Sequence, residues 1–328
     1  MKTTQQRGVV LLMTLMVLAV VATLSMYTLK HLDRSVALVT FRQDEAIIRQ
    51  QLLGGEAWAS VWFARHYDAL ANVSVPKLDQ PWHLLSQEFA LDRSTEHLQI
   101  DVVERQACIN LNLLGDAARA ALTEQRLARL SNALSLDSTW IAVLKDWIDN
   151  DQDLTSAVSH EDEYYLGLEP AFRSADSALV DASELALLPI PESVFTRLAP
   201  YTCWRPEGDQ INLNRLNEPL IKAYFPTLDE QKSAALLARL ASSGFDSVEA
   251  FLAWPDLSDE ALNPTEWRME SRYIEVYVTL NAEQTKRFLH SRLRRLDDGR
   301  VVAFARAFEP FDVLSNTLTQ RNIETNSR

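Results

Sequence analysis

The sequence predicts an α+β fold, in which a long N-terminal helix packs on an antiparallel sheet and a large helical domain is inserted between early and late strands. Three observations predict it: a long apolar run near the N-terminus that continues into an amphipathic pattern, two regions in which apolar and polar residues alternate, and a helical pattern between those regions. The 328 residues exceed one average domain, and a hydrophobic content of 47% suffices for a core.

The N-terminal apolar run spans Val9–Leu29 and contains 21 residues without a charge. As a helix it would cross about 30 Å, the thickness of the hydrocarbon core of a membrane. Lys2 and Arg7 precede it and favour a cytoplasmic N-terminus, although Lys30 and Arg34 on the far side weaken that assignment. A secretory signal peptide has a shorter apolar region that ends in a small-x-small site, and this run continues past that point. A plain signal anchor stays open as an alternative.

The helical pattern continues beyond this run with charged residues interspersed, so we expect one helix of about 50 residues. Gly54–Gly55 is a weak point in it. The amphipathic face around Ile47–Val61 could pack on partner helices or on the chain's own sheet, and the pattern favours neither. The residues that carry the pattern are Ile47, Ile48, Leu52, Leu53, Ala57, Val61 and Ala64.

Strands are predicted on both sides of the helical middle. Apolar residues alternate with polar ones over 98–102 and 274–280, and further strands are expected at Phe288–Leu293 and Val301–Phe308, with Asp297-Asp298-Gly299 as the turn between the last two. From about residue 314 the chain is polar and is expected to fray. A solvated strand face is expected for the basic stretch formed by Lys286, Arg287, Arg292, Arg294 and Arg295.

The charge balance argues against nucleic acid as a partner. The formal net charge is −13, and a surface of that sign repels phosphate backbones. The two cysteines, Cys108 and Cys203, would be buried thiols in a cytosolic protein and a disulfide in a body outside the cytoplasm. Such a bridge would close a loop of roughly 100 residues and would stabilise the fold by about 4–5 kcal/mol in the chain-entropy model.

The middle of the chain crowds carboxylates into one loop region that begins at Asp146. Because unpaired carboxylates repel one another, a hard divalent cation would stabilise the loop, and calcium suits an irregular, oxygen-rich loop better than magnesium. A solvated acidic loop without metal is the other interpretation. The expected calcium ligands come from Asp149, Asp151, Asp153, Glu161 and Asp162.

Enzyme chemistry finds little support in the motifs. His160-Glu161 begins like the zinc-protease motif H-E-x-x-H, but Tyr164 stands where the second histidine must be. The sequence contains no G-x-S-x-G elbow, P-loop or G-x-G-x-x-G loop. We therefore expect a protein that is not an enzyme.

Two similar stretches, 109–112 and 211–214, each read Ile-Asn-Leu-Asn and each precede a helical run, at 117–134 and 219–240. Asn112 and Asn214 are predicted to cap those helices.

These motifs together resemble a known family. Arg7-Gly8 followed directly by the apolar run resembles a type III prepilin leader, which a prepilin peptidase cuts after the glycine, so that Val9 becomes the first mature residue and is methylated. Most pilins carry glutamate at the fifth mature position, which here is Met13. The minor pseudopilin K of the type II secretion system is known for lacking that glutamate. Its D-W-x-D-x-D and E-D-x-Y-Y stretches are similar to residues 146–151 and 161–165.

The resemblance implies a pseudopilin fold and a tip subunit of the pseudopilus that initiates or caps the filament. It implies the minor pseudopilins I and J as partners, a single-pass location in the inner membrane with a periplasmic body, and approach to the secretin or to secreted cargo. With the cysteines then outside the cytoplasm, a Cys108–Cys203 disulfide is expected at the base of the inserted segment. The expected parts are a leader at 1–8, a transmembrane segment at 9–29, the helix and first strands at 30–107, the inserted domain at 108–266, late strands at 267–313 and a tail at 314–328.

Three alternatives stay open. One is an unprocessed, membrane-anchored periplasmic binding module, which would keep its leader. A metal-dependent periplasmic hydrolase would lose activity without metal. A tip protein of a type IV pilus would share the leader, and only the motifs of the middle segment speak against it.

Overall fold

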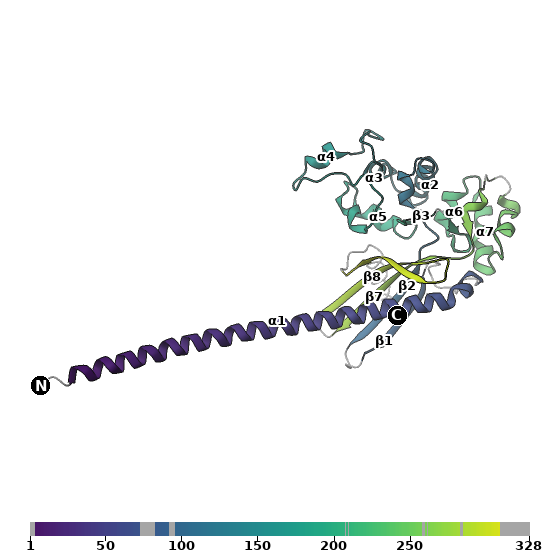
Figure 1. The fold of residues 1–328 in the computed structure, drawn as a ribbon. Helices are drawn as coiled ribbons and strands as arrows, with labels where there is room; N and C mark the ends of the chain where they lie inside the picture. The colour runs from purple at the N-terminus through teal and green to yellow at the C-terminus, as the bar shows by residue number, and fades with distance from the viewer. Residues whose placement is uncertain are drawn as a thin grey trace. The chain divides into compact units, whose positions relative to one another are not determined.

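The computed structural model describes residues 4–72, 83–91, 96–206, 208, 210–257, 260, 262–282 and 285–308. Figure 1 shows the helices and strands of the chain. The chain divides into two units, residues 1–51 and residues 52–328. The predicted tail at 314–328 lies outside the described residues.

Helix α1, Thr4–Asn72, is 69 residues long and therefore exceeds the predicted helix of about 50 residues. In the first unit its apolar side chains are exposed, with Met13 65% and Leu18 68% accessible. By length and composition α1 can cross a membrane, since an 18-residue window within it reaches a mean hydropathy of 2.3. The helix also continues through Gly54–Gly55 without a break.

The second unit contains a five-stranded antiparallel sheet with the strand order β1-β2-β7-β8-β9. Both predicted groups of strands contribute to it, which confirms the sheet as antiparallel and formed across the inserted segment. The edge strand β1 lies in the segment 30–107 that is expected to contain the first strands, but no alternating pattern predicts it. The strands are β1 His83–Ala90, β2 His97–Glu104, β7 Tyr273–Ala282, β8 Thr285–Arg295 and β9 Val301–Ala307.

The last part of α1 packs on this sheet through one narrow face. Gly55 lies so close to the sheet that a Cβ atom there would be 2.7 Å from Val278 Cγ1 and 3.3 Å from Ile100 Cδ1. The buried positions that follow, Ala59 and Phe63, continue the same face at helical spacing. The two glycines are thus part of the contact surface. They do not interrupt the helix.

The expected amphipathic face is divided between two environments. Leu52 is buried, whereas Ala57, Val61 and Ala64 lie on an exposed face, with Val61 50% accessible. The chain's own sheet therefore covers only one side of this part of α1.

An ion pair and a hydrogen bond attach α1 to strands β9 and β8 of the sheet. The buried Glu56 carboxylate accepts hydrogen bonds from Arg306 Nε and Nη2 at 2.6 and 2.7 Å, and from the Ser291 hydroxyl. Burial alone would raise the pKa of Glu56, but the hydrogen bonds from Arg306 and Ser291 outweigh it and hold that pKa below its ordinary value.

The segment between β2 and β7 is mainly helical and surrounds one hydrophobic core that reaches from Ala107 to Trp267. Two parallel two-residue pairs, β3–β4 and β5–β6, lie within it. Its elements are β3 Ile109–Asn110, η1 Leu111–Gly115, α2 Ala120–Ala133, α3 Trp140–Ile148, α4 Asp162–Leu166, η2 Ala182–Leu187, α5 Glu192–Leu198, β4 Thr202–Cys203, β5 Ile211–Asn212, η3 Leu213–Arg215, α6 Glu218–Tyr224, α7 Glu230–Ser242, α8 Val248–Leu252, η4 Pro255–Leu257, η5 Pro264–Glu266 and β6 Trp267–Arg268.

The helical run predicted at 219–240 is two helices, α6 and α7. Pro226 follows the C-cap residue of α6, Phe225, and cannot supply the backbone N–H that a continuous helix would need. Asp229 then begins α7, because its side chain accepts the N–H of Lys232.

Candidate functional site

The two Ile-Asn-Leu-Asn stretches have nearly the same backbone geometry. Asn110 (φ −76°, ψ 110°) caps η1 and Asn212 (φ −75°, ψ 111°) caps η3, each by accepting the N–H two residues on. The prediction that Asn112 and Asn214 are the caps is therefore wrong. The caps of the two 3₁₀ helices stand two residues earlier, since each stretch enters its 3₁₀ helix directly from a short strand, and the following helices α2 and α6 begin after Arg119 and Asn217.

Asn112 and Asn214 instead hold distant backbone. The Asn112 carboxamide accepts the N–H of Leu179 at 2.8 Å and donates to its carbonyl at 3.1 Å. The Asn214 carboxamide makes the same pair of bonds to Phe245, both at 2.9 Å. Each asparagine carboxamide thus bonds both the N–H and the carbonyl of one distant residue, as the backbone of a neighbouring strand would, and so it holds a loop against its half of the inserted segment.

Cys108 and Cys203 form a disulfide, as predicted, with their Cα atoms 5.8 Å apart. The bridge stands beside the β3–β4 pair, in which Asn110 faces Cys203. It therefore joins the start of the inserted segment to a point 95 residues later in the chain.

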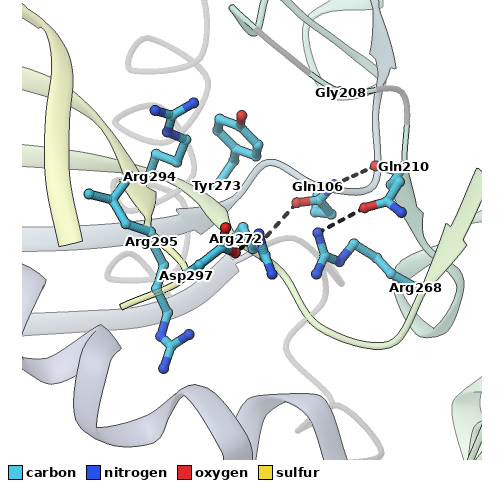
Figure 2. A pocket seen from close by; sticks show the side chains of 10 residues that line it. Gln106, Gly208, Gln210, Arg268, Arg272, Tyr273, Arg294, Arg295 and Asp297 are labelled. Carbon is cyan, nitrogen blue, oxygen red and sulfur yellow. Dashed lines mark hydrogen bonds and ion pairs between the residues drawn. The ribbon is translucent and has the colours of Figure 1, made fainter. Parts of the chain in front are cut away.

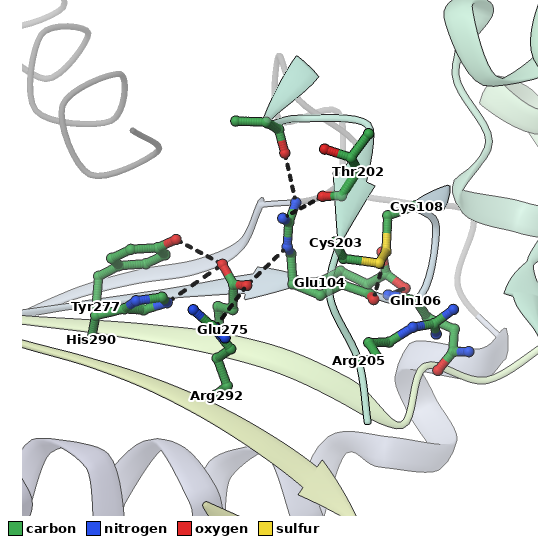
Figure 3. A network of polar contacts seen from close by, with 12 residues as sticks. Glu104, Gln106, Cys108, Thr202, Cys203, Arg205, Glu275, Tyr277, His290 and Arg292 are labelled. Carbon is green, nitrogen blue, oxygen red and sulfur yellow. Dashed lines mark hydrogen bonds and ion pairs between the residues drawn. A yellow bond between two sulfur atoms is a disulfide. The ribbon is translucent and has the colours of Figure 1, made fainter. Parts of the chain in front are cut away.

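A buried charged network lies between the sheet and the inserted segment (Figure 3). At its centre, the Glu275 carboxylate lies 3.2 Å from Arg105 Nε and 3.5 Å from His290 Nε2, and it accepts the Tyr277 hydroxyl at 2.7 Å. Arg292 Nε is 3.9 Å away. Burial by itself would raise the pKa of Glu275, but the cationic neighbours, led by Arg105, hold it well below its ordinary value.

Two arginines carry this network into the inserted segment. Arg105 donates to the carbonyls of Ala199 and Thr202, at 3.1 and 2.7 Å, and Arg292 donates to the carbonyl of Val180 at 2.7 Å. Arg292 is only 4% exposed and its guanidinium lies over the Trp204 ring. The prediction of a solvated basic strand face is thus wrong for Arg292, because the inserted segment covers that side of the sheet.

The sequence prediction missed this network. The only available signal was Glu275 in β7 and the alternation of His290, Arg292 and Arg294 in β8, a pattern that is the same for a solvated face and for a face that another part of the chain covers.

The acidic loop brings some of the predicted carboxylates into one electrostatic environment. Asp149 Oδ1 and both carboxylate oxygens of Glu161 are buried without a hydrogen-bond donor. Burial and the nearby Asp151 raise the pKa of Asp149 to about 6, and burial together with Asp146 and Asp149 raises the pKa of Glu161 to about 7. Unpaired buried oxygens of this kind are the donor set that a hard cation requires.

The remaining predicted ligands have other partners. Asp162 accepts Arg173 Nη1 at 2.7 Å and both the N–H and the hydroxyl of Ser174 at 3.0 Å. Asp153 is exposed, and its N–H donates to Asp151. Among the residues that the structure describes, no three acidic, histidine or cysteine side chains form a ready-made metal cluster. The predicted five-residue ligand set therefore stays a prediction.

Two acidic residues outside the predicted set also act on this loop. Asp146 is fully buried and accepts the N–H of Thr155 at 3.0 Å, and Asp176 contributes to the raised pKa of Glu161. His160, the first residue of the incomplete zinc motif, stacks on the Tyr164 ring at 3.8 Å between centroids.

Comparison with known proteins assigns the family. Profiles described as Type II secretion system protein K match residues 107–207 and 211–266. Type II secretion system protein K of Klebsiella pneumoniae is 31% identical over 269 residues, which cover 77% of this chain and 81% of that protein. The chain belongs to the type II secretion system protein K family. Protein K of Pseudomonas aeruginosa is 26% identical, and the match covers 92% of both chains.

The protein K fold is also known from experiment. A chain in the crystal structure of the GspK-GspI-GspJ complex from the type 2 secretion system of enterotoxigenic Escherichia coli matches with a TM-score of 0.65 and 24% identity. The match covers 82% of this chain and 99% of that one. It confirms the predicted fold class, and the family confirms the resemblance that the leader and the middle motifs suggested.

In this member of the protein K family the predicted processing residues, Gly8 and Val9, lie within α1. Met13, at the position where most pilins carry glutamate, also lies on α1 and is exposed in the chain by itself.

Proposed function

We propose that this protein is a minor pseudopilin that occupies the tip of the type II secretion pseudopilus and initiates or caps its assembly. Membership of the protein K family and Met13 at the fifth mature position support the proposal. A glutamate there would neutralise the N-terminal amine of a neighbouring subunit. A tip subunit has no such neighbour above it, so it does not need the charge.

Two further features support entry into the pilin assembly route. The Arg7-Gly8 leader precedes a helix long enough to cross the inner membrane. The body carries a disulfide, which is typical of an oxidising compartment such as the periplasm. The protein would thus be cut by a prepilin peptidase after Gly8, methylated at Val9, and held in the inner membrane with its body in the periplasm.

The partners we propose are the minor pseudopilins I and J, because the similar Escherichia coli chain was solved in complex with GspI and GspJ. The exposed face formed by Ala57, Val61 and Ala64 supports a helix-to-helix contact, since the sheet covers only the other side of α1. Small and β-branched residues at this spacing allow two helices to approach closely.

The test is the intact mass of the chain after co-expression with a prepilin peptidase, followed by co-purification with subunits I and J. We expect a chain that begins with methylated Val9 and a stable three-subunit complex. A chain that still begins at Met1, with the peptidase active on a control prepilin, would refute processing and favour the anchored binding module. Replacement of Val61 by Glu should weaken the complex and leave processing unchanged.

We also propose that the acidic loop binds calcium, with Asp149 and Glu161 as the principal ligands and Asp151 beside them. The unpaired buried oxygens of the first two support this proposal. A bound cation would compensate the repulsion that raises both pKa values. The bonds that Asp162 makes to Arg173 and Ser174 make it a support of the loop and a weaker candidate ligand.

Calorimetric titration of calcium into the purified chain tests this site. We expect saturable binding that Glu161→Gln weakens by roughly tenfold or more, and that Glu163→Gln, which removes an exposed carboxylate of the same loop, leaves unchanged. Absence of both binding heat and thermal stabilisation by calcium would refute the assignment. The hydrolase alternative has no support in the family.

A further inference from the structure

Large apolar side chains gather at the surface of one short part of the inserted segment. Leu154 is 59% accessible and Leu166 is 48% accessible. Elsewhere in the described part of the inserted segment, the large apolar side chains that are exposed are Leu122, Val180 and Leu187. The gathered side chains, termed the apolar face, are Leu154, Val158, Tyr164, Leu166 and Leu168. A group of this kind marks a surface that another molecule covers.

Bonds within the loop tie the two halves of the apolar face together. The backbone N–H of Asp162, at the start of α4, donates to Gln152 Oε1 at 3.3 Å, so the chain just before Leu154 lies beside α4. The Tyr164 ring stacks on His160, which belongs to the connection between the two halves. The apolar face is therefore one small surface and not two separate loops.

The core beneath this face is already filled. Tyr165 is fully buried, and its ring centroid lies 5.1 Å from that of Trp147 and 5.3 Å from that of Phe172. Successive residues of a helix point in different directions, so Tyr164 and Leu166, on either side of Tyr165, do not face this core. Their contact with water is unfavourable and ends when another molecule covers them.

The rim of the apolar face is acidic. No lysine or arginine occurs between Lys145 and Arg173, whereas eight carboxylates do. Arg173 itself pairs with Asp162 at 2.7 Å. Arg268 and Arg272 line a cavity whose described lining contains no residue of this loop (Figure 2). Exposed carboxylates beside the apolar side chains, outside the calcium ligands proposed above, are Asp153, Glu163 and Glu169.

The sign of this rim decides among possible partners. It repels an anionic lipid surface and the phosphates of a nucleic acid. A second copy of the chain would set the same carboxylates against each other in a two-fold contact. A protein segment that carries lysine or arginine beside apolar side chains is attracted by the rim and buries its apolar side chains against the face.

We propose that the apolar face binds a basic, apolar segment of another protein. The apolar side chains of that segment cover Leu154 and Leu166, and its lysine or arginine side chains lie beside Glu163 and Glu169. The surface is separate from the exposed side of α1. The inference depends neither on the proposed role in secretion nor on the proposed calcium site.

Fluorescence anisotropy tests the proposal, with the full chain in phosphatidylcholine nanodiscs and a short labelled peptide of lysine and leucine as the probe. Empty nanodiscs supply the background. We expect saturable binding that Leu166→Ser weakens by about fivefold or more. Glu163→Gln should weaken it by about twofold or more, while leaving calcium binding unchanged.

Two matched controls keep the result specific to this face. Leu122→Ser and Glu249→Gln each remove an exposed side chain of the same type from another part of the inserted segment and should leave peptide binding unchanged. Equal weakening in the controls would overturn the proposal, as would unchanged binding in both variants of the face.

Two further peptides test the chemistry that the face selects. A peptide of lysine and serine carries only the charge, and a peptide of glutamate and leucine carries only the apolar side chains. Both should bind more weakly than the lysine and leucine peptide, and equal or tighter binding of either would overturn the assignment.

Two other occupants are measurable in the same preparation. A dimer in sedimentation that Leu166→Ser dissociates would assign the face to a second copy. Co-flotation of the nanodiscs with phosphatidylglycerol vesicles that the same substitution abolishes would assign it to a membrane. Either result would overturn the proposal.

Discussion

The paired glycines of α1, Gly54 and Gly55, offer the sharpest test of how closely this helix packs against the sheet. Gly54 has no atom within 4 Å of an added Cβ, whereas an added Cβ at Gly55 would lie 2.7 Å from Val278 Cγ1. Replacing either by alanine gains the same helix propensity, about 0.5–1 kcal/mol. Any difference between the two variants therefore reports the contact with the sheet.

The contact at Gly55 has little room to relax. Val278 is 1% exposed and Ile100 is fully buried, and the β-branched side chain of Val278 has few alternative rotamers. Overpacking of this kind costs about 1–3 kcal/mol. We thus expect Gly54→Ala to raise the free energy of unfolding by up to about 1 kcal/mol. The free energy of unfolding of Gly55→Ala should be about 1–3 kcal/mol lower than that of Gly54→Ala.

The assay is urea unfolding of the full chain in detergent, followed by tryptophan fluorescence at fixed detergent concentration. Equal stabilisation by both alanines would refute the argument, because it would mean that α1 does not approach the sheet this closely. A loss of stability at Gly54 would refute the assignment of that position to the open side of the helix.

Three further predictions concern the charges and the bridge of the body. Glu56→Ala leaves the buried Ser291 hydroxyl without its acceptor and should lower the free energy of unfolding by about 1–3 kcal/mol, measured in urea at pH 7. Because the folded-state pKa of Glu56 is lowered, the stability that this carboxylate contributes is present above its unfolded pKa and is lost as pH falls through the folded value. The difference in free energy of unfolding between Glu56→Ala and the unchanged protein should therefore become smaller in acid. Replacing Cys108 and Cys203 together by serine should lower the free energy of unfolding by up to about 4–5 kcal/mol. Denaturant unfolding under non-reducing conditions measures this loss, and an unchanged unfolding midpoint would contradict it. Since the pKa of Glu161 is raised to about 7, the metal-free loop is less stable above that pH than below it. Calcium should therefore raise the melting temperature more at pH 8 than at pH 5.5. An equal rise at both pH values would contradict the role of this carboxylate.

Much of the architecture follows from patterns that are local in the sequence. The apolar run from Val9 predicts the start of α1, and the alternation at 98–102 and 274–280 predicts strands that do pair, as β2 and β7. The turn at 297–299 is also local, and Gly299 adopts the positive φ of 86° that such a turn requires. These features depend on each residue's immediate neighbours, and the sequence displays those neighbours directly.

The site depends on residues that are distant in the chain. Both Ile-Asn-Leu-Asn stretches are visible in the sequence, but only the fold brings Leu179 to Asn112 and Phe245 to Asn214. The acidic residues are equally visible, yet only the fold distinguishes Glu161, whose oxygens lack donors, from Asp162, whose oxygens are paired.

The sequence by itself predicted an N-terminal helix long and apolar enough to cross a membrane, strands on both sides of a helical middle, and the two cysteines that pair. Only the tertiary structure decided which charges are buried and what they face. Arg292 and Arg295 belong to the same basic stretch, but the inserted segment covers the first, while the second lines an open cavity. The free energy of a charge depends on its desolvation and on the groups around it, and long-range contacts set both.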